Sequence, residues 1–366
     1  MTKQELFHIG ITEPDRGIYD AAKRRFDRLA KPIDGLGDAE NLICRIAAIQ
    51  GKELPDISKK VLVILCADNG VVREGVSQTD QSVTAAVASL MAEGRSSVGA
   101  MTRAYPLDIL PVDIGIDSDV PVPGILNCRI ARGTGNIVRE PAMTEGECLQ
   151  AIETGIGLAR ECADKGYGLI ATGEMGIGNT TTSTAVFCAL TGEEPEQVTG
   201  RGAGLTNEGL ARKIDAIRRA LTFHGWYGKE AEDPEEAPEV LRRLGGLDLA
   251  GLAGLYIGGA RYRIPVVIDG FISAVAALLA ERILPGTAAF MIASHTGRER
   301  GTARALERLG LKPLIDADLA LGEGTGAVLL LPMLDMAMSL YCHGVSFEET
   351  QITAYERYSH DQSDHR

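Results

Sequence analysis

The sequence has no excess of basic residues and only a few aromatic ones. Its 366 residues include 37 Lys and Arg against 50 Asp and Glu, which gives a formal net charge of −13. A nucleic-acid-binding protein needs a basic stripe and a protein bound to anionic lipid needs a basic patch, so both classes are disfavoured. Aromatic residues make up 5% of the chain, whereas 43 residues are glycine. This balance suits an α/β enzyme with glycine-rich loops better than a β-sandwich.

Long apolar runs and paired cysteines are also missing. The longest apolar run, 327–334, contains Pro332 and is far shorter than the about 20 residues of a membrane span. The polar start, from Met1 to Glu5, lacks the apolar core of a signal peptide. The seven cysteines are scattered and form no CxxC motif, so we expect reduced thiols in a cytoplasmic protein.

Apolar runs bounded by turn residues alternate with helical patterns along most of the chain. The expected strands are 61–67, 107–112, 168–171, 265–268, 288–293 and 313–315. The expected helices are 16–29, 39–50, 83–105, 180–190, 210–223 and 272–284. This alternation predicts a mostly parallel, doubly wound sheet, which binds ligands at the carboxyl ends of its strands. We expect the acidic segment 228–239 to be a surface loop and the polar end 358–366, with His360 and His365, to be frayed.

A glycine-rich segment at 172–184 follows one of these strands and opens a helix. Its glycines would let a ligand approach the backbone closely, and Asn179 or Thr180 could cap the helix. A helix N-terminus of this kind can bind phosphate through its N–H groups. The spacing from Gly173 to Gly178 is that of a P-loop, but Asn179 stands where the lysine should be. The segment is therefore either a phosphate site or an ordinary glycine-rich turn.

Another glycine cluster carries a carboxylate. In 322–326 (GEGTG), Glu323 lies between two glycines after the last expected strand. Such a carboxylate could act as a general base, although a surface glutamate in a turn has the same pattern. The cluster at 200–204 (GRGAG) matches no dinucleotide-binding fingerprint and is interpreted as a tight turn.

Three further polar residues remain ambiguous from the sequence. No HxxxH, HExxH or Cys/His spacing supports a metal site at His295, so we interpret it as a polar lining or capping residue. Asp269 ends an expected strand and could bind either loop amides or a ligand. Lys213, in an expected helix, is either solvated or placed near a phosphate. The sequence also has no GxSxG nucleophile elbow and no acidic metal-binding motif.

Seven segments of the chain together resemble one enzyme family. They are 28–51 (RLAKPIDGLGDAENLICRIAAIQG), 66–84 (CADNGVVREGVSQTDQSVT), 172–186 (TGEMGIGNTTTSTAV), 199–205 (TGRGAGL), 266–280 (VVIDGFISAVAALLA), 293–300 (ASHTGRER) and 321–337 (LGEGTGAVLLLPMLDMA). The sequence thereby resembles the nicotinate-nucleotide–dimethylbenzimidazole phosphoribosyltransferases, enzymes of cobalamin lower-ligand assembly. The segments follow the family's order, and the pair GEMGIGNTT and LGEGTGA is the most specific part of the resemblance.

The resemblance implies an architecture and a reaction. A large α/β catalytic domain at 60–330 would contain a mostly parallel, Rossmann-like sheet flanked by helices. A small helical domain would combine both chain ends, 1–59 and 331–366. The enzyme would be a homodimer without cofactor or metal. It would transfer 5-phosphoribose from nicotinate mononucleotide to an aromatic base such as 5,6-dimethylbenzimidazole, giving an α-riboside phosphate and nicotinate.

The resemblance also implies the site residues, with Glu323 as the general base. The residues expected to bind substrate are Glu174, Gly176, Gly178, Asn179, Thr180, Gly202, Lys213, Ser77, Gln81 and Ser294. The glycine-rich segment would hold the ribose phosphate, with Glu174 near the sugar and Lys213 near the nucleotide. Ser77 and Gln81 would border the base pocket.

The chain departs from the family pattern in two places. Asn69 stands where the family commonly has the histidine of Asp-His-Gly. The family's SHxSxEPGH stretch reads SHTGRERGT at 294–302, without the proline and the last histidine. These changes leave the acceptor base open among other benzimidazoles, purines and phenolics.

Two alternatives lie outside this reaction. A non-catalytic nucleotide-binding protein on the same fold would be indicated by loss of Glu323, which is present. A transferase that uses phosphoribosyl pyrophosphate would need an acidic loop for magnesium, which the sequence lacks.

Overall fold

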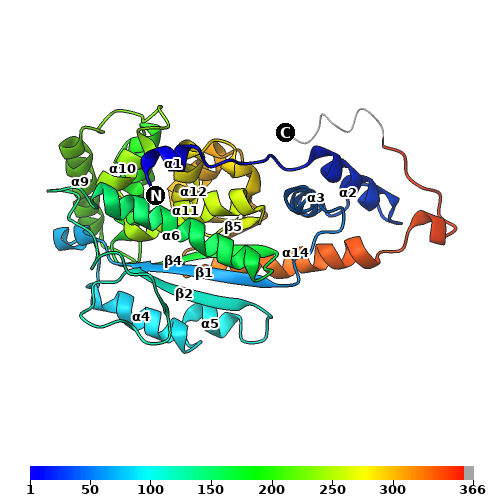
Figure 1. Ribbon diagram of the computed structural model, residues 1–366, viewed down its shortest axis with the longest axis horizontal. Helices are drawn as coiled ribbons and strands as arrows, with labels where there is room; N and C mark the ends of the chain where they lie inside the picture. Colours follow the sequence, from blue (N-terminus) through cyan, green and yellow to red (C-terminus); the bar gives the residue numbers. More distant parts are fainter. Residues whose placement is uncertain (358–366) are drawn as a thin grey trace. The chain divides into compact units, whose positions relative to one another are not determined.

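The computed structural model describes residues 1–357 and divides into two compact units (Figure 1). The large unit contains Met1–Glu13 and Ile57–Leu330, and the small unit contains Pro14–Asp56 and the residues from Leu331 onward. The expectation for the polar end 358–366, including His360 and His365, falls outside the described residues.

Six parallel strands form the main sheet of the large unit. They are β1 (Lys60–Ala67), β2 (Asp108–Gly115), β3 (Leu126–Asn127), β4 (Leu169–Met175), β5 (Val266–Ile268) and β6 (Met291–Ala293). Their order is β3-β2-β1-β4-β5-β6, and every neighbouring pair is parallel. The chain crosses between the halves of the sheet at β1 and β4, the switch point at which such sheets bind ligands. The predicted α/β fold with a mostly parallel, Rossmann-like sheet is confirmed.

Continuous apolar sequence explains the central strands. All eight residues of β1 and the first five of β4 are buried. Strands covered on both faces need such runs. In Figure 1, α6 (Glu145–Asp164) and α11 (Leu247–Tyr262) lie on one side of the sheet, and α4 (Ser82–Ala92) and α5 (Ser97–Met101) lie on the other. The other helices of this unit are α1 (Lys3–Phe7), α7 (Asn179–Thr191), α8 (Pro195–Val198), α9 (Asn207–His224), α10 (Ala237–Leu244), α12 (Phe271–Ile283) and α13 (Arg300–Arg308), with the 3-10 turns η1 (Gly70–Glu74) and η2 (Thr287–Phe290).

The prediction of one helix at 83–105 was wrong. The structure has two helices there, α4 and α5. Gly94 adopts a φ of 65°, which ends the first helix, and the Ser96 side chain accepts from the N–H of Gly99 to start the second. The segment expected to be a surface loop, 228–239, ends in the first turn of α10.

The strand predictions also differ from the structure. The expected strand 288–293 begins in the turn η2, and only its last three residues form β6. The apolar run at 313–315 does not join the main sheet, because β8 (Ile315–Leu319) pairs with β7 (His295–Gly297) in a separate two-stranded sheet. The main sheet is completed instead by β3, which the sequence analysis did not predict. β3 has only two residues, and both are exposed, so the sequence contains no apolar run that would predict this strand.

Residues 1–13 belong to the large unit, whereas the sequence analysis assigned all of 1–59 to the small domain. Leu6 of α1 is fully buried in the core of the large unit. The amino group of Met1 pairs with Glu153, and Arg261 donates to the carbonyl of Gly10 at 2.9 Å. These contacts hold the N-terminal segment to the large unit.

The small unit is helical. It contains α2 (Arg16–Arg28), α3 (Asp38–Gln50), the later part of α14 (Thr325–His343) and the turn η3 (Phe347–Glu349). The rings of Phe26 and Tyr341 lie 4.7 Å apart between centroids.

Helix α14 is the one helix within residues 1–357 that is long and apolar enough to cross a membrane. Half of its apolar window is buried. Core helices of soluble proteins meet the same criterion, so this is weak evidence for a membrane span.

Candidate active site

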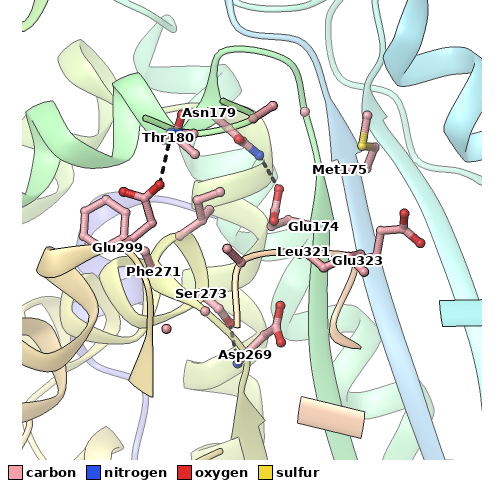
Figure 2. A pocket seen from close by; sticks show the side chains of 18 of the residues that line it. Glu174, Met175, Asn179, Thr180, Asp269, Phe271, Ser273, Glu299, Leu321 and Glu323 are labelled. Atoms are coloured by element: carbon pink, nitrogen blue, oxygen red, sulfur yellow. Dashed lines mark hydrogen bonds between the residues drawn. The ribbon is translucent and has the colours of Figure 1, made fainter. Parts of the chain in front are cut away.

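A cavity opens where β4, β5 and β6 end, at the edge of the sheet where parallel α/β folds place their ligands. Its volume is about 390 Å³, within the about 300–1,000 Å³ typical of small-molecule pockets. The whole lining belongs to the large unit. Figure 2 shows Phe271 and Glu299 on one side of the cavity and Glu174, Met175 and Glu323 on the other.

The loop between β4 and α7 forms one wall. Gly176 lies so close to β1 that a Cβ would overlap the carbonyl oxygen of Ala67. Gly178, with a φ of 95°, is the N-cap residue of α7, and no side chain caps this helix. The N–H groups of Asn179 and Thr181 donate to the backbone carbonyls of Gly176 and Gly178, at 3.2 and 2.9 Å. The helix dipole favours an anion at this end of α7, where no side chain competes for the site.

The prediction that Asn179 or Thr180 caps this helix was wrong. Asn179 is buried, and its amide nitrogen donates to Glu174 and, at 3.1 Å, to Asp248. The hydroxyl of Thr180 accepts from Nζ of Lys213 at 2.9 Å. Both side chains are bound by neighbouring elements, so the backbone is what the loop offers to a ligand.

Lys213 lies directly behind this wall. Its side chain is 1% exposed, and Nζ also donates to the carbonyl of Gly200 at 3.2 Å. A Cβ at Gly202 would lie 3.5 Å from Nζ, and Glu299 accepts from the Gly202 N–H at 3.1 Å. Burial lowers the pKa of Lys213 to about 8, and the charge of Glu299 opposes this shift. A phosphate bound at the loop would further favour the charged ammonium.

Glu323 lies in a turn in which three successive residues have positive φ. The values are 84° at Gly322, 58° at Glu323 and 81° at Gly324. This conformation costs a glutamate about 1–2 kcal/mol, and such strain persists only where the surroundings fix the backbone. Oε2 of Glu323 accepts from the N–H of Val98 at 3.2 Å. Gly173 of β4 gives the turn room, because a Cβ there would lie 3.0 Å from the Glu323 carbonyl.

Asp269 and His295 both line the cavity. Of the two alternatives for Asp269, the structure shows the binding of loop amides: its carboxylate accepts from the N–H groups of Gly324, Gly326 and Ala327. The interpretation of His295 as a lining residue is confirmed.

Glu174 is half-buried, lines the cavity and belongs to an acidic cluster. Asn179 links it to Asp248, which is fully buried in the first turn of α11. Loss of water raises the pKa of Glu174 to about 8, the charge of Asp248 adds to this shift, and the hydrogen bond from Asn179 opposes it. Burial likewise raises the pKa of Asp248 to about 6. The raised pKa favours the protonated form of Glu174, which can donate a hydrogen bond to a ligand. Across residues 1–357, no group of three or more His, Cys, Asp or Glu side chains is arranged to hold a metal ion.

Glu174→Gln is expected to stabilise the protein at high pH. The stabilising contribution of Glu174 is complete below its ordinary pKa of 4.5 and is lost as pH rises through about 8, because the folded state keeps the proton that the unfolded state releases. The variant should exceed the wild type in free energy of unfolding by about 1–3 kcal/mol at pH 9, with the gap closing toward pH 5. Urea unfolding at pH 5, 7 and 9 measures this difference. A gap that does not depend on pH would contradict the assignment.

The structure brings most of the predicted site residues together. The cavity is lined by Glu174, Gly176, Asn179, Thr180, Gly202 and Glu323. Ser77 and Gly178 line a smaller cavity of about 90 Å³ that shares part of this wall. Gln81, Lys213 and Ser294 line neither cavity. The hydroxyl of Ser294 donates instead to the carbonyl of Ile268 at 2.6 Å.

Asp248, Glu299 and Phe271 are functional-site residues that had no predicted role. A signal for Asp248 was present, since a single carboxylate in the apolar run 247–257 must be bonded if it is buried. Glu299 also had a signal, since it matches the glutamate of the family's SHxSxEPGH stretch. Phe271 had none, because its position in the cavity depends on how α12 packs.

A family model described as phosphoribosyltransferase matches residues 11–352. The chain belongs to this family. A nicotinate-nucleotide–dimethylbenzimidazole phosphoribosyltransferase of Acetivibrio thermocellus is 43% identical over 92% of this chain and 94% of its own length. One of Clostridium acetobutylicum is 42% identical over 95% and 97%. A crystal structure of CobT from Thermus thermophilus has a TM-score of 0.85 at 38% identity, and the match covers 93% of this chain and all of that one. The resemblance recognised in the sequence is confirmed.

The two departures of this phosphoribosyltransferase from the family pattern differ in position. Asn69 is fully buried and accepts from the Thr182 hydroxyl at 3.0 Å, and it does not line the cavity. Thr302, which replaces the last histidine of the family's stretch, does line the cavity. Within the described residues its buried hydroxyl has no hydrogen-bond partner. Only the second departure therefore alters the cavity wall.

Proposed function

We propose that this protein transfers 5-phosphoribose from nicotinate mononucleotide to an aromatic base such as 5,6-dimethylbenzimidazole. The products are the α-riboside 5′-phosphate, for the cobalamin nucleotide loop, and nicotinate. The observation that carries the proposal is the position of Glu323, in a strained turn on the wall of a cavity that also contains an uncapped helix start. The names of the relatives support the two substrates.

The chemistry needs one base and one anchor. The pyridinium nitrogen of nicotinate mononucleotide leaves C1′ with the bonding electrons and becomes a neutral pyridine, so it needs no acid. A ring nitrogen of the acceptor attacks C1′ from the opposite face, which inverts the β-riboside to the α product. The acceptor's N–H proton passes to the carboxylate of Glu323, acting as general base. Anchoring of the phosphate holds C1′ in line for the attack.

The cavity suggests how the substrate residues divide this work. The backbone from Gly176 to Thr180 would bind the 5′-phosphate, with Gly202 lining the cavity beside it and Lys213 supplying positive charge behind it. Glu174, protonated, would donate to the ribose. The family resemblance, and not the cavity lining, would put Ser77 and Gln81 beside the acceptor, since Ser77 lines the smaller cavity and Gln81 lines neither. Other benzimidazoles, purines and phenolics remain alternative acceptors.

The experiment that tests this function is incubation of the protein with nicotinate mononucleotide and a panel of bases, followed by mass spectrometry of the products. We expect nicotinate and an α-riboside phosphate in equal amounts. Release of nicotinate without any riboside would contradict the transfer.

Turnover is expected to continue in excess chelator, since no pyrophosphate leaves and no step needs a metal. The rate with EDTA should stay within about twofold of the untreated rate, whereas a metal-assisted step is worth several kcal/mol. Loss of activity that magnesium restores would show that the reaction differs from the one proposed.

We also propose that the protein is a homodimer in the cytoplasm. Helix α14 exposes Leu329, Met333 and Met336 at spacings that place them on one helix face. Exposed apolar faces of this kind mark interaction surfaces. All seven cysteines are free, which supports a reducing compartment. Sedimentation should give twice the mass of one chain at micromolar concentration, and a monomer would count against the dimer.

A further inference from the structure

Asp269 lies directly after β5 and is 3% exposed. Its Oδ2 accepts from the N–H of Gly324 at 3.2 Å. Its Oδ1 accepts from the N–H groups of Gly326 at 2.8 Å and of Ala327 at 3.0 Å. The carboxylate that follows β5 thus accepts from three backbone N–H groups. One lies in the turn directly after Glu323 and two lie in the first residues of α14.

These bonds act on strained backbone. Glu323 and both flanking glycines have positive φ, and such a conformation persists only if the surroundings fix it. Hydrogen bonds to an ionised carboxylate are about twice as strong as neutral ones, and the start of a helix favours negative charge. The Gly324 amide directly follows Glu323, so its bond to Asp269 fixes the direction in which the Glu323 side chain leaves the turn.

His295 supports the same turn from another side. Its ring occupies the space at Gly326, where a Cβ would overlap it, and its Nδ1 lies 2.9 Å from the Ser294 hydroxyl. Burial raises the pKa of Asp269, while the charge of His295 and the three amides favour its carboxylate form.

We infer that Asp269 is a positioning residue, whose carboxylate holds the 322–327 backbone so that Glu323 meets the incoming base in the geometry for proton transfer. This inference rests on the proposed function, in which Glu323 is the general base. Asp269 would not exchange a proton with substrate. Its effect on the rate would pass through Glu323.

Asp269→Asn tests the inference, because the amide keeps the size but turns an N–H₂ group toward one of the backbone donors. We expect kcat with 5,6-dimethylbenzimidazole to fall by about 10–100-fold, as misplacement of a catalytic group does. The KM for nicotinate mononucleotide should stay within about twofold, since the phosphate loop does not contact Asp269. Asp113→Asn is the control: Asp113 is also buried, lies in β2 and accepts from the N–H of Ile116 and from the Arg129 guanidinium, away from the cavity. It should leave kcat unchanged.

A double-mutant cycle separates positioning from general damage. In a Glu323→Gln background, Asp269→Asn should lower kcat by less than about twofold, because the group that it positions is already gone. An undiminished loss in that background, or a rise in KM without a fall in kcat, would overturn the inference. If Glu323→Gln alone is fully active, it is the proposed role of Glu323 that fails. Should Asp269→Asn not fold, Asp269→Ser, which leaves room for a bridging water, gives the same cycle.

Discussion

Glu323→Gln is expected to lower kcat by about 10²–10⁴-fold, the usual contribution of a general base. Gln keeps the size of the side chain and can still accept from the Val98 N–H, but it cannot take the proton of the incoming base. The binding of nicotinate mononucleotide should change little, because the phosphate is expected at the start of α7 and not at Glu323. Steady-state rates with saturating base, together with calorimetric binding of the nucleotide, measure the two effects separately.

Glu281→Gln is the matched control for this substitution. Glu281 also accepts from backbone N–H groups in a glycine turn, those of Gly286 and Ala288, at 3.0 and 2.7 Å, and it does not line the cavity. Its replacement should leave kcat unaffected. A Glu323→Gln enzyme with a near-wild-type rate would move the role of base elsewhere, and Glu174 would be the next candidate.

The long central strands and the glycine-rich turns could be predicted from the sequence because their signals are local. Seven of the eight buried residues of β1, 61–67, form one apolar run, and the turn around Glu323 has glycine on both sides, each with positive φ. The short strands could not be predicted in the same way. Strand β3 and the pairing of β7 with β8 depend on which backbone segment lies beside them. A run of two or three residues contains no information about that neighbour.

The sequence predicts less about residues that bind other site residues than about residues that line the cavity. Asp269 was recognised as ambiguous, and only the packing of α14 against the end of β5 determines that it binds the turn of Glu323. Asn179 was expected to be a helix cap, but the fold brings Asp248 from α11 within 3.1 Å of its amide nitrogen. Each of these contacts joins segments more than 50 residues apart, so sequence spacing cannot reveal them.

The phosphate loop should respond to a single methyl group. Gly178→Ala is expected to weaken the binding of nicotinate mononucleotide by about 10–100-fold, or about 1.4–2.8 kcal/mol. The new Cβ would lie 2.9 Å from Cγ2 of Val72 and 3.2 Å from Asn69, at a φ of 95° that alanine disfavours. Relief of this crowding must move Gly178, and with it the N–H groups that start α7.

Gly192→Ala at the other end of α7 separates this effect from a loss of stability. Gly192 also has a positive φ, 69°, but its Cβ would meet nothing closer than 3.6 Å. Both variants carry the strain of a left-handed alanine, about 1–2 kcal/mol, so both should lower the free energy of unfolding. Only Gly178→Ala should weaken nucleotide binding in calorimetric titrations. Equal affinities for the two variants would place the phosphate away from this helix start. The phosphate could then not hold C1′ in line with the acceptor base beside Glu323.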